Sequence, residues 1–186
     1  GEPIASTLTM TGREYAILAG DNPVSDMRAL DRVPDILARG TIALPSFVDD
    51  DGAFPKSGGK GVILGPQPNS PEERGAVAAL YAAFSANLCL DVLGSTTPIV
   101  IDGGFATNQA FGFLLAALRP NQPVSMSRSK DGTALGAGLL WRRFARTAPV
   151  KSVLTDHVSP VSVTGLREAA SEWLALADQT SSAYTS

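Results

Sequence analysis

From residue 70 onward, segments with a helical pattern alternate with short apolar segments. Ser70 and Pro71 open the first helix, because Ser is a favoured N-cap and Pro suits the first helical position. The stretch 74–93 contains no proline, and its large apolar residues recur at steps of three and four. Two β-branched or apolar runs, 98–102 and 123–127, flank a second helical stretch that stops before Pro120. Alternation at this spacing predicts an α/β layer in which the two strands are adjacent and parallel.

The rest of the chain is assigned more coarsely. We predict a third helix over 133–144 after a turn at 130–132, a connection over 149–163, a last helix over 165–178 and a polar tail. Before residue 70, the runs 7–10, 41–44 and 62–64 are short and typical of strands, with turn residues between them. The helix over 74–93 is apolar on most sides, so we expect it to be buried between layers.

Composition excludes several classes of protein. A chain of 186 residues suits about one domain. The net charge of −3 and the pI near 5.1 argue against a nucleic-acid-binding module, which works through clustered cations. One cysteine, Cys89, and one histidine, His157, exclude a disulfide framework and a multi-Cys or multi-His metal centre. No uninterrupted apolar run reaches about 18 residues, so we expect no membrane span and a cytoplasmic protein.

Two glycines follow the predicted strand at 98–102, and a helix follows them. Gly103 and Gly104 permit backbone conformations that other residues avoid, and Asn108 stands near the start of the helix. In open α/β sheets, ligands bind beyond the carboxyl ends of the strands, and this arrangement suits a nucleotide. Spacing alone leaves open a simpler interpretation, in which the glycines serve only the turn and its packing. A dinucleotide-binding domain ranks last, because the next strand ends in residues 125–128 without the acidic residue that such a domain needs.

The order of these motifs resembles the C-terminal domain of the FGGY family of carbohydrate kinases. The likeness covers about residues 7–178 and rests on Asp102-Gly103-Gly104-Phe105-Ala106-Thr107-Asn108, followed by Asp131-Gly132-Thr133-Ala134-Leu135-Gly136-Ala137-Gly138. The runs Lys60 to Gly65 and Arg74 to Tyr81 are similar to the family as well. Within the family, Thr11 to Tyr15 and the closing Gly165 to Ala177 resemble the L-fuculokinase and rhamnulokinase-like branch.

The resemblance implies a ribonuclease-H-like domain of the actin and hexokinase type, one of two domains that enclose ATP and Mg²⁺. It implies that Gly103 and Gly104 lie against adenosine and that Asn108 reaches the adenine. Gly12, at a helix start after a strand over 7–11, matches a second nucleotide-contacting glycine. Gly136 and Ala137 match close-packing positions. The parent enzyme would transfer the ATP γ-phosphate to a hydroxyl of a ketose or deoxy sugar, with this piece on the adenosine side.

The departures from the family pattern are equally informative. The chain lacks the family's N-terminal domain, both phosphate-binding loops and the catalytic aspartate, which lies upstream of the residues present. We therefore expect no catalytic residue here, a domain truncated at its N-terminus, and no activity in this chain alone. We divide it into a partial C-terminal domain, 1–149, and a connection, helix and tail, 150–186. Its expected partners are adenine nucleotide, a sugar bound through the missing domain, and either itself or the rest of the parent kinase. The alternative is a non-catalytic, actin-like module that binds nucleotide or a partner.

Other candidate residues favour plain structural roles. Asp102 is expected to bond its own turn, His157 to be exposed in a loop, and Cys89 to be an inert buried thiol. Asp49 to Asp51 lack the ligand spacing of an EF-hand, so we interpret them as a solvated turn without a metal. The basic helix end with Arg142, Arg143 and Arg146 is expected to complement the helix dipole at the surface.

Overall fold

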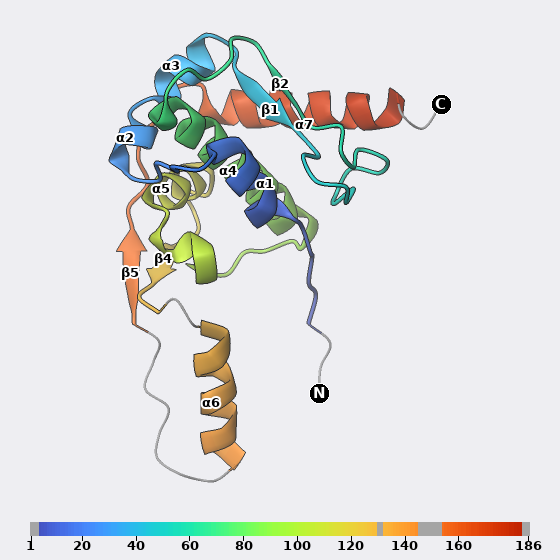
Figure 1. Cartoon of the computed structure of the whole chain (residues 1–186). Coiled ribbons are helices and arrows are strands. Elements are labelled where there is room, and N and C mark those ends of the chain that lie inside the picture. Colours follow the sequence, from blue (N-terminus) through green and yellow to red (C-terminus); the bar gives the residue numbers. More distant parts are fainter. Residues whose placement is uncertain (1–3, 130–131, 145–153, 184–186) are drawn as a thin grey trace.

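The computed structural model describes residues 4–129, 132–144 and 154–183 (Figure 1). Its helices are α1 (Thr11–Ala19), α2 (Met27–Leu30), α3 (Val33–Ala38), α4 (Pro71–Val92), the 3₁₀ helix η1 (Gly103–Thr107), α5 (Gln109–Leu118), α6 (Gly132–Phe144) and α7 (Leu166–Ala183). Its strands are β1 (Ile42–Leu44), β2 (Val62–Leu64), β3 (Ile99–Ile101), β4 (Val124–Ser127) and β5 (Thr155–Val158). The mixed α/β class predicted from the sequence is confirmed.

The larger sheet has the order β3-β4-β5. β3 and β4 are adjacent and parallel, with Ile99 opposite Val124, as the alternation of elements predicts. β5 pairs antiparallel with β4 within the predicted connection over 149–163, so the prediction of a connection without a strand there is wrong. β5 has a mostly exposed pattern, which is why periodicity did not reveal it. A separate antiparallel pair, β1-β2, forms the smaller sheet.

Helix α4 is the central element. The Ser70 hydroxyl accepts the Glu73 N–H at 3.1 Å, so the predicted cap is present, and the Glu73 carboxylate accepts the Asn69 N–H at 2.7 Å. The helix contacts α1, α2, α3 and α5. Residues 75–84 are buried as expected, whereas the second half, from 85 to 92, is only partly covered. By length and composition α4 could cross a membrane, but 61% of its most apolar window is buried within the protein, as in a core helix.

The two ends of the chain also differ from expectation. Residues 7–10 form no strand, and α1 begins directly at Thr11. The last helix, α7, continues to Ala183, well beyond the predicted end at 178. It is held by Trp173, which is almost fully buried, contacts the rings of Phe54, Tyr81 and Phe84, and donates its Nε1–H to the Ala43 carbonyl at 2.8 Å.

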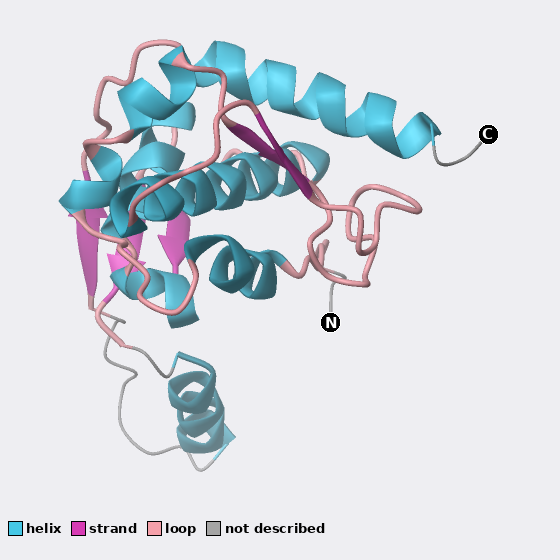
Figure 2. Ribbon diagram, turned by 45° about the horizontal axis from the view of Figure 1, so that its top comes forward, coloured by secondary structure: helices cyan, strands magenta, loops and turns pink. Residues whose placement is uncertain are grey.

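Helix α6 stands apart from the rest of the described chain (Figures 1 and 2). A side chain added at Gly136 would meet no atom within 4 Å, and Ala137 is exposed. The expected close packing of these two residues is therefore wrong, because no described element covers this part of the helix. Trp141 is 74% exposed, which is unusual for a large aromatic side chain in a folded domain.

Candidate functional site

The glycine turn lies where β3 ends. Gly103 has a φ of +68°, a conformation that side chains rarely adopt, so glycine is needed there for the backbone. Gly104 has no such constraint. A Cβ added at either glycine would meet nothing within 4 Å. The packing interpretation therefore gains no support, because both residues face open space, and the absence of a side chain at Gly104 has no explanation within the described chain.

Asn108 lies beneath this turn and is 4% exposed. Its Oδ1 accepts the Phe111 N–H at 3.0 Å and so caps α5, while its own N–H donates to the Phe105 carbonyl at 3.0 Å. Burial raises the pKa of the nearby Tyr15 hydroxyl, and the Asn108 side chain acts in the opposite direction. Asn108 thus joins η1 to α5, with its carbonyl oxygen already engaged.

Gly12 lies on α1, the helix whose Tyr15 contacts the glycine turn. Gly12 is exposed at the start of α1, and a Cβ there would meet nothing within 4 Å. Three residues further on, the Tyr15 ring meets the Phe105 ring of η1 edge to face, with centroids 5.4 Å apart. The start of α1 and the glycine turn are therefore adjacent, although the strand expected before Gly12 is missing.

Asp102 does not bond its own turn, contrary to expectation, because its carboxylate makes no capping hydrogen bond to η1. The first residue of α6 lies against this carboxylate instead. A Cβ built on Gly132 would clash with Asp102 Oδ2, so only glycine fits there without displacing Asp102. Sequence reasoning missed this role of Gly132, although a glycine at a helix start after a turn is a signal that could have raised it.

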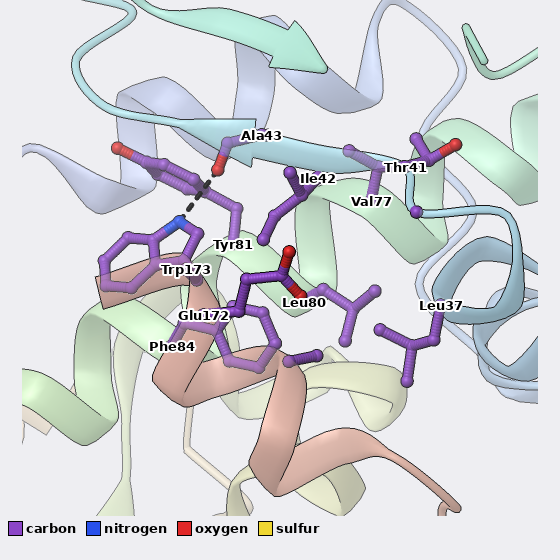
Figure 3. A pocket seen from close by; sticks show the side chains of 12 residues that line it. Leu37, Thr41, Ile42, Ala43, Val77, Leu80, Tyr81, Phe84, Glu172 and Trp173 are labelled. Carbon is purple, nitrogen blue, oxygen red and sulfur yellow. Dashed lines mark hydrogen bonds between the residues drawn. The ribbon is translucent and has the colours of Figure 1, made fainter. Parts of the chain in front are cut away.

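Two cavities help to place the site. One of about 350 Å³ opens beside the turn and is lined by Asp102 and Phe105, together with Thr11 of α1. The other, shown in Figure 3, lies between Leu80 and Phe84 of α4, β1, and Trp173 of α7. It holds only about 40 Å³, room for a very few waters, and no residue of the glycine turn lines it. We therefore regard the second cavity as a feature of core packing.

The remaining candidates form no second site in the described part of the chain, where no cluster of three or more potential metal ligands occurs. Asp50 and Asp51 accept the backbone N–H groups of Gly52 and Gly58, so the acidic run is a turn, as predicted. His157 is exposed as predicted, but in β5 rather than in a loop. Cys89 is half-buried rather than buried, and the Thr7 hydroxyl lies 3.2 Å from its Sγ.

Two further predictions fall wholly or partly on residues outside the described ranges. Lys130 and Asp131, in the predicted turn before α6, lie outside the described residues, as does Arg146. The side chains of Arg142 and Arg143 are not described either. Their expected surface role stays a prediction.

Comparison with known proteins places these observations in a family. The model of the carbohydrate kinase FGGY C-terminal domain matches residues 1–149. Among solved structures, the chain is similar to a carbohydrate kinase from Novosphingobium aromaticivorans, with 29% identity and a TM-score of 0.73. That match covers 90% of this chain and 36% of the other, so the chain spans about a third of the length of that kinase. No curated protein matches the chain.

Proposed function

Because the chain belongs to the FGGY carbohydrate kinases, we propose that it forms the adenosine-binding side of an ATP-dependent sugar kinase. The parent enzyme transfers the γ-phosphate of ATP to a hydroxyl of a ketose or deoxy sugar. The sugar binds mainly through the part of the enzyme outside these residues. The L-fuculokinase and rhamnulokinase-like branch and the ribonuclease-H-like architecture belong to this proposal.

The open glycine turn carries the proposal. Gly103 and Gly104 expose main chain at the carboxyl end of β3, the place where open α/β sheets bind ligands. A residue without a side chain, facing empty space and free of strain, is explained by a ligand that approaches the backbone closely. Gly12 adds a second open backbone position on the adjacent helix. Asn108 holds the turn onto α5, and its amide group is the proposed contact to adenine.

The proposed role of this chain is binding and orientation rather than bond making. Phosphoryl transfer depends on positioning the nucleotide and neutralising the charge on its phosphates. Asp102 is the carboxylate nearest to the turn, but its Oδ2 lies against Gly132, and we assign it no catalytic role. The described residues do not build a Mg²⁺ site. A Mg²⁺ ion arriving with ATP would be held mostly by phosphates and water on this side of the cleft.

Calorimetry with ATP and Mg²⁺ tests the proposal. We expect weak binding by the chain, because charge-assisted phosphate contacts contribute strongly to nucleotide affinity and the phosphate loops are missing. Gly104→Val should abolish the signal by placing a branched side chain against the nucleoside. Gly138→Val is the matched control, since that glycine also has open space around it but lies on the exposed part of α6. Equal binding by the wild type and Gly104→Val would remove the site from the turn.

The cellular setting forms a second part of the proposal. We place the enzyme in the cytoplasm, where ATP is available and a lone, half-buried thiol such as Cys89 persists in reduced form. The division of the chain at residue 149 also remains a proposal. Trp173 of α7 packs on Tyr81 of α4, so the two proposed parts share one core.

A further inference from the structure

The Tyr15 hydroxyl is a buried polar group to which neither the fold nor the proposed function gives a partner. Its oxygen is buried and forms no hydrogen bond with the described residues. Arg39 and Arg119 each have one buried nitrogen without a partner as well, but their guanidinium groups form other hydrogen bonds. A hydroxyl that has lost its bonds to water without gaining others is costly to keep. A phenylalanine would fill the same space without that cost, so the hydroxyl requires a further partner to explain it.

Asn108 is the polar side chain that acts on this hydroxyl. Both residues contact Phe105, because the Tyr15 ring meets the Phe105 ring edge to face and the Asn108 N–H donates to the Phe105 carbonyl. Burial raises the pKa of Tyr15, and the Asn108 side chain lowers it by a smaller amount. A lowering of this kind is the effect of a donor that faces the phenol oxygen. An Asn108 N–H therefore faces the protonated hydroxyl, but the hydrogen bond between them is not complete.

The cap of α5 determines which end of the Asn108 amide is available. Its Oδ1 accepts the Phe111 N–H at 3.0 Å, so the two donors on Nδ2 lie at the opposite end of the amide. One hydrogen bond leaves the amide plane free to tilt, because the torsion that turns it has a broad minimum. A second bond, from Nδ2 to the Tyr15 oxygen, would fix the plane. The remaining N–H of Nδ2 would then have a single direction.

We propose that Tyr15 is a positioning residue of the nucleotide site, whose hydroxyl holds one N–H of the Asn108 amide so that the other N–H donates to a ring nitrogen of adenine. This inference rests on the proposed function, which assigns the Asn108 amide to adenine. Tyr15 does not touch the nucleotide itself, because its hydroxyl oxygen is buried. The bond between the two side chains shortens when nucleotide binds, as polar contacts in binding sites commonly do. Helix α1 thus contributes both the open backbone at Gly12 and the group that orients Asn108.

Tyr15→Phe tests the proposal, because it removes the hydroxyl and keeps the aromatic ring. We expect the affinity for ATP to fall about fivefold, the effect of losing one ordinary hydrogen bond. In the Asn108→Ser background, which lacks the amide, Tyr15→Phe should change the ATP affinity less than about twofold, because Tyr15 acts through that amide. Tyr81→Phe is the matched control, since it also removes a buried hydroxyl, but one that faces Glu14 and Ser85. The ATP affinity of Tyr81→Phe should equal that of the wild type.

NMR of the isotope-labelled chain follows the Asn108 side-chain amide directly, with and without nucleotide. Asn108→Ser identifies the two N–H signals of this amide, because it deletes them. Without nucleotide, Tyr15→Phe should move these signals, whereas Tyr81→Phe should leave them in place. A role of Tyr15 in packing alone would not move them, because the variant keeps the ring. Titration with ATP and Mg²⁺ should shift the wild-type signals, and such titrations measure weak affinities in all the variants.

Three results would overturn the inference. The first is an undiminished ATP affinity in Tyr15→Phe. The second is a loss of about fivefold that persists in the Asn108→Ser background, because Tyr15 would then act independently of the amide. The third is a set of Asn108 amide signals that do not respond to Tyr15→Phe in the absence of nucleotide. This third result needs no ATP, so it is distinct from a failure of the proposed function, which would appear as a wild-type chain that binds no ATP.

Discussion

Asn108 caps α5, a structural role, and we propose that it also contacts adenine, a ligand-binding role. Its Oδ1 caps α5, whereas the contact to adenine would use its amide N–H groups. Gly104 differs, since nothing in the described chain depends on its lack of a side chain. At the scale of single residues, structural and ligand-binding roles can therefore be separated by the choice of substitution.

Substitution of Asn108 by Ser and by Ala distinguishes these two tasks. Ser retains an oxygen that can cap the helix, so the free energy of unfolding of Asn108→Ser should lie within about 0.5 kcal/mol of the wild-type value. The free energy of unfolding of Asn108→Ala should be lower by about 1 kcal/mol, because Ala cannot cap the helix. Both variants lack the amide and should bind ATP more weakly. Urea unfolding measures the first effect and calorimetry the second. Undiminished nucleotide binding by Asn108→Ser would confine this residue to its capping role.

Two helical glycines should respond in opposite directions to substitution by Ala. A Cβ at Gly75 would clash with the Val24 carbonyl oxygen, a backbone atom that cannot move aside cheaply, so we expect Gly75→Ala to destabilise the fold by about 1–3 kcal/mol. Gly138 has open space on an exposed helix, and Gly138→Ala should be neutral or stabilising by up to about 1 kcal/mol. Thermal unfolding of both variants provides the measurement, and similar shifts in the two would contradict the packing at Gly75.

At the scale of elements, several side-chain contacts meet at the start of α4. Glu73 accepts the Asn69 N–H and pairs with Arg39, whose Nη1 lies 3.0 Å from Glu73 Oε1. The Arg39 hydrogen bond, followed by the Asn69 N–H, lowers the pKa of Glu73 below its ordinary value of 4.5. This junction attaches the end of α3 to the first turn of α4.

The lowered pKa of Glu73 predicts a definite pH dependence. A carboxylate whose pKa is lower in the folded than in the unfolded state stabilises the fold above the unfolded value and loses that contribution as pH falls through the folded one. The contribution of Glu73 should therefore be complete above about pH 5.5 and decline below 4.5. Glu73→Gln should flatten the fall of unfolding free energy between pH 5 and 3. An unchanged slope in that variant would show that the Arg39 contact is not maintained in solution.

At the scale of the whole molecule, the described chain is a core with uncovered surfaces. Apolar side chains are uncovered in the cavity beside β3, at Trp141 of α6 and along the second half of α4. The proposed site can bind a nucleoside through exposed main chain, but the described residues include no group that we assign to take a proton from a sugar hydroxyl.

We predict that the chain alone does not phosphorylate sugars. The reason is that we identify no catalytic base and no phosphate-binding loop among the described residues, and phosphoryl transfer needs both the sugar hydroxyl and the phosphates to be held in place. A coupled assay of ADP release with a panel of ketoses and deoxy sugars should give no rate above background. Light scattering across concentration should show association, through the uncovered apolar surfaces, either of copies of the chain or with the rest of the kinase when it is added. Robust turnover by a purified monomer would refute both expectations and would locate catalytic residues that we have not identified.

The sequence by itself determined the features that depend on local periodicity and turn chemistry. The capped start of α4 and the glycine turn follow from residue spacing, because each is set by contacts within a short stretch of chain. The parallel pair β3-β4 follows from the alternation of helices and strands along the sequence. The tertiary structure alone decided what those stretches meet. β5 is a strand because β4 offers it an edge, and the second half of α4 borders the cavity beside β3. A Cβ on Gly132 would meet the Asp102 carboxylate, which lies 30 positions away in the sequence, so the Asp102 side chain would have to move to admit it. No local pattern records such contacts, since the residues that make them are brought together only when the chain folds.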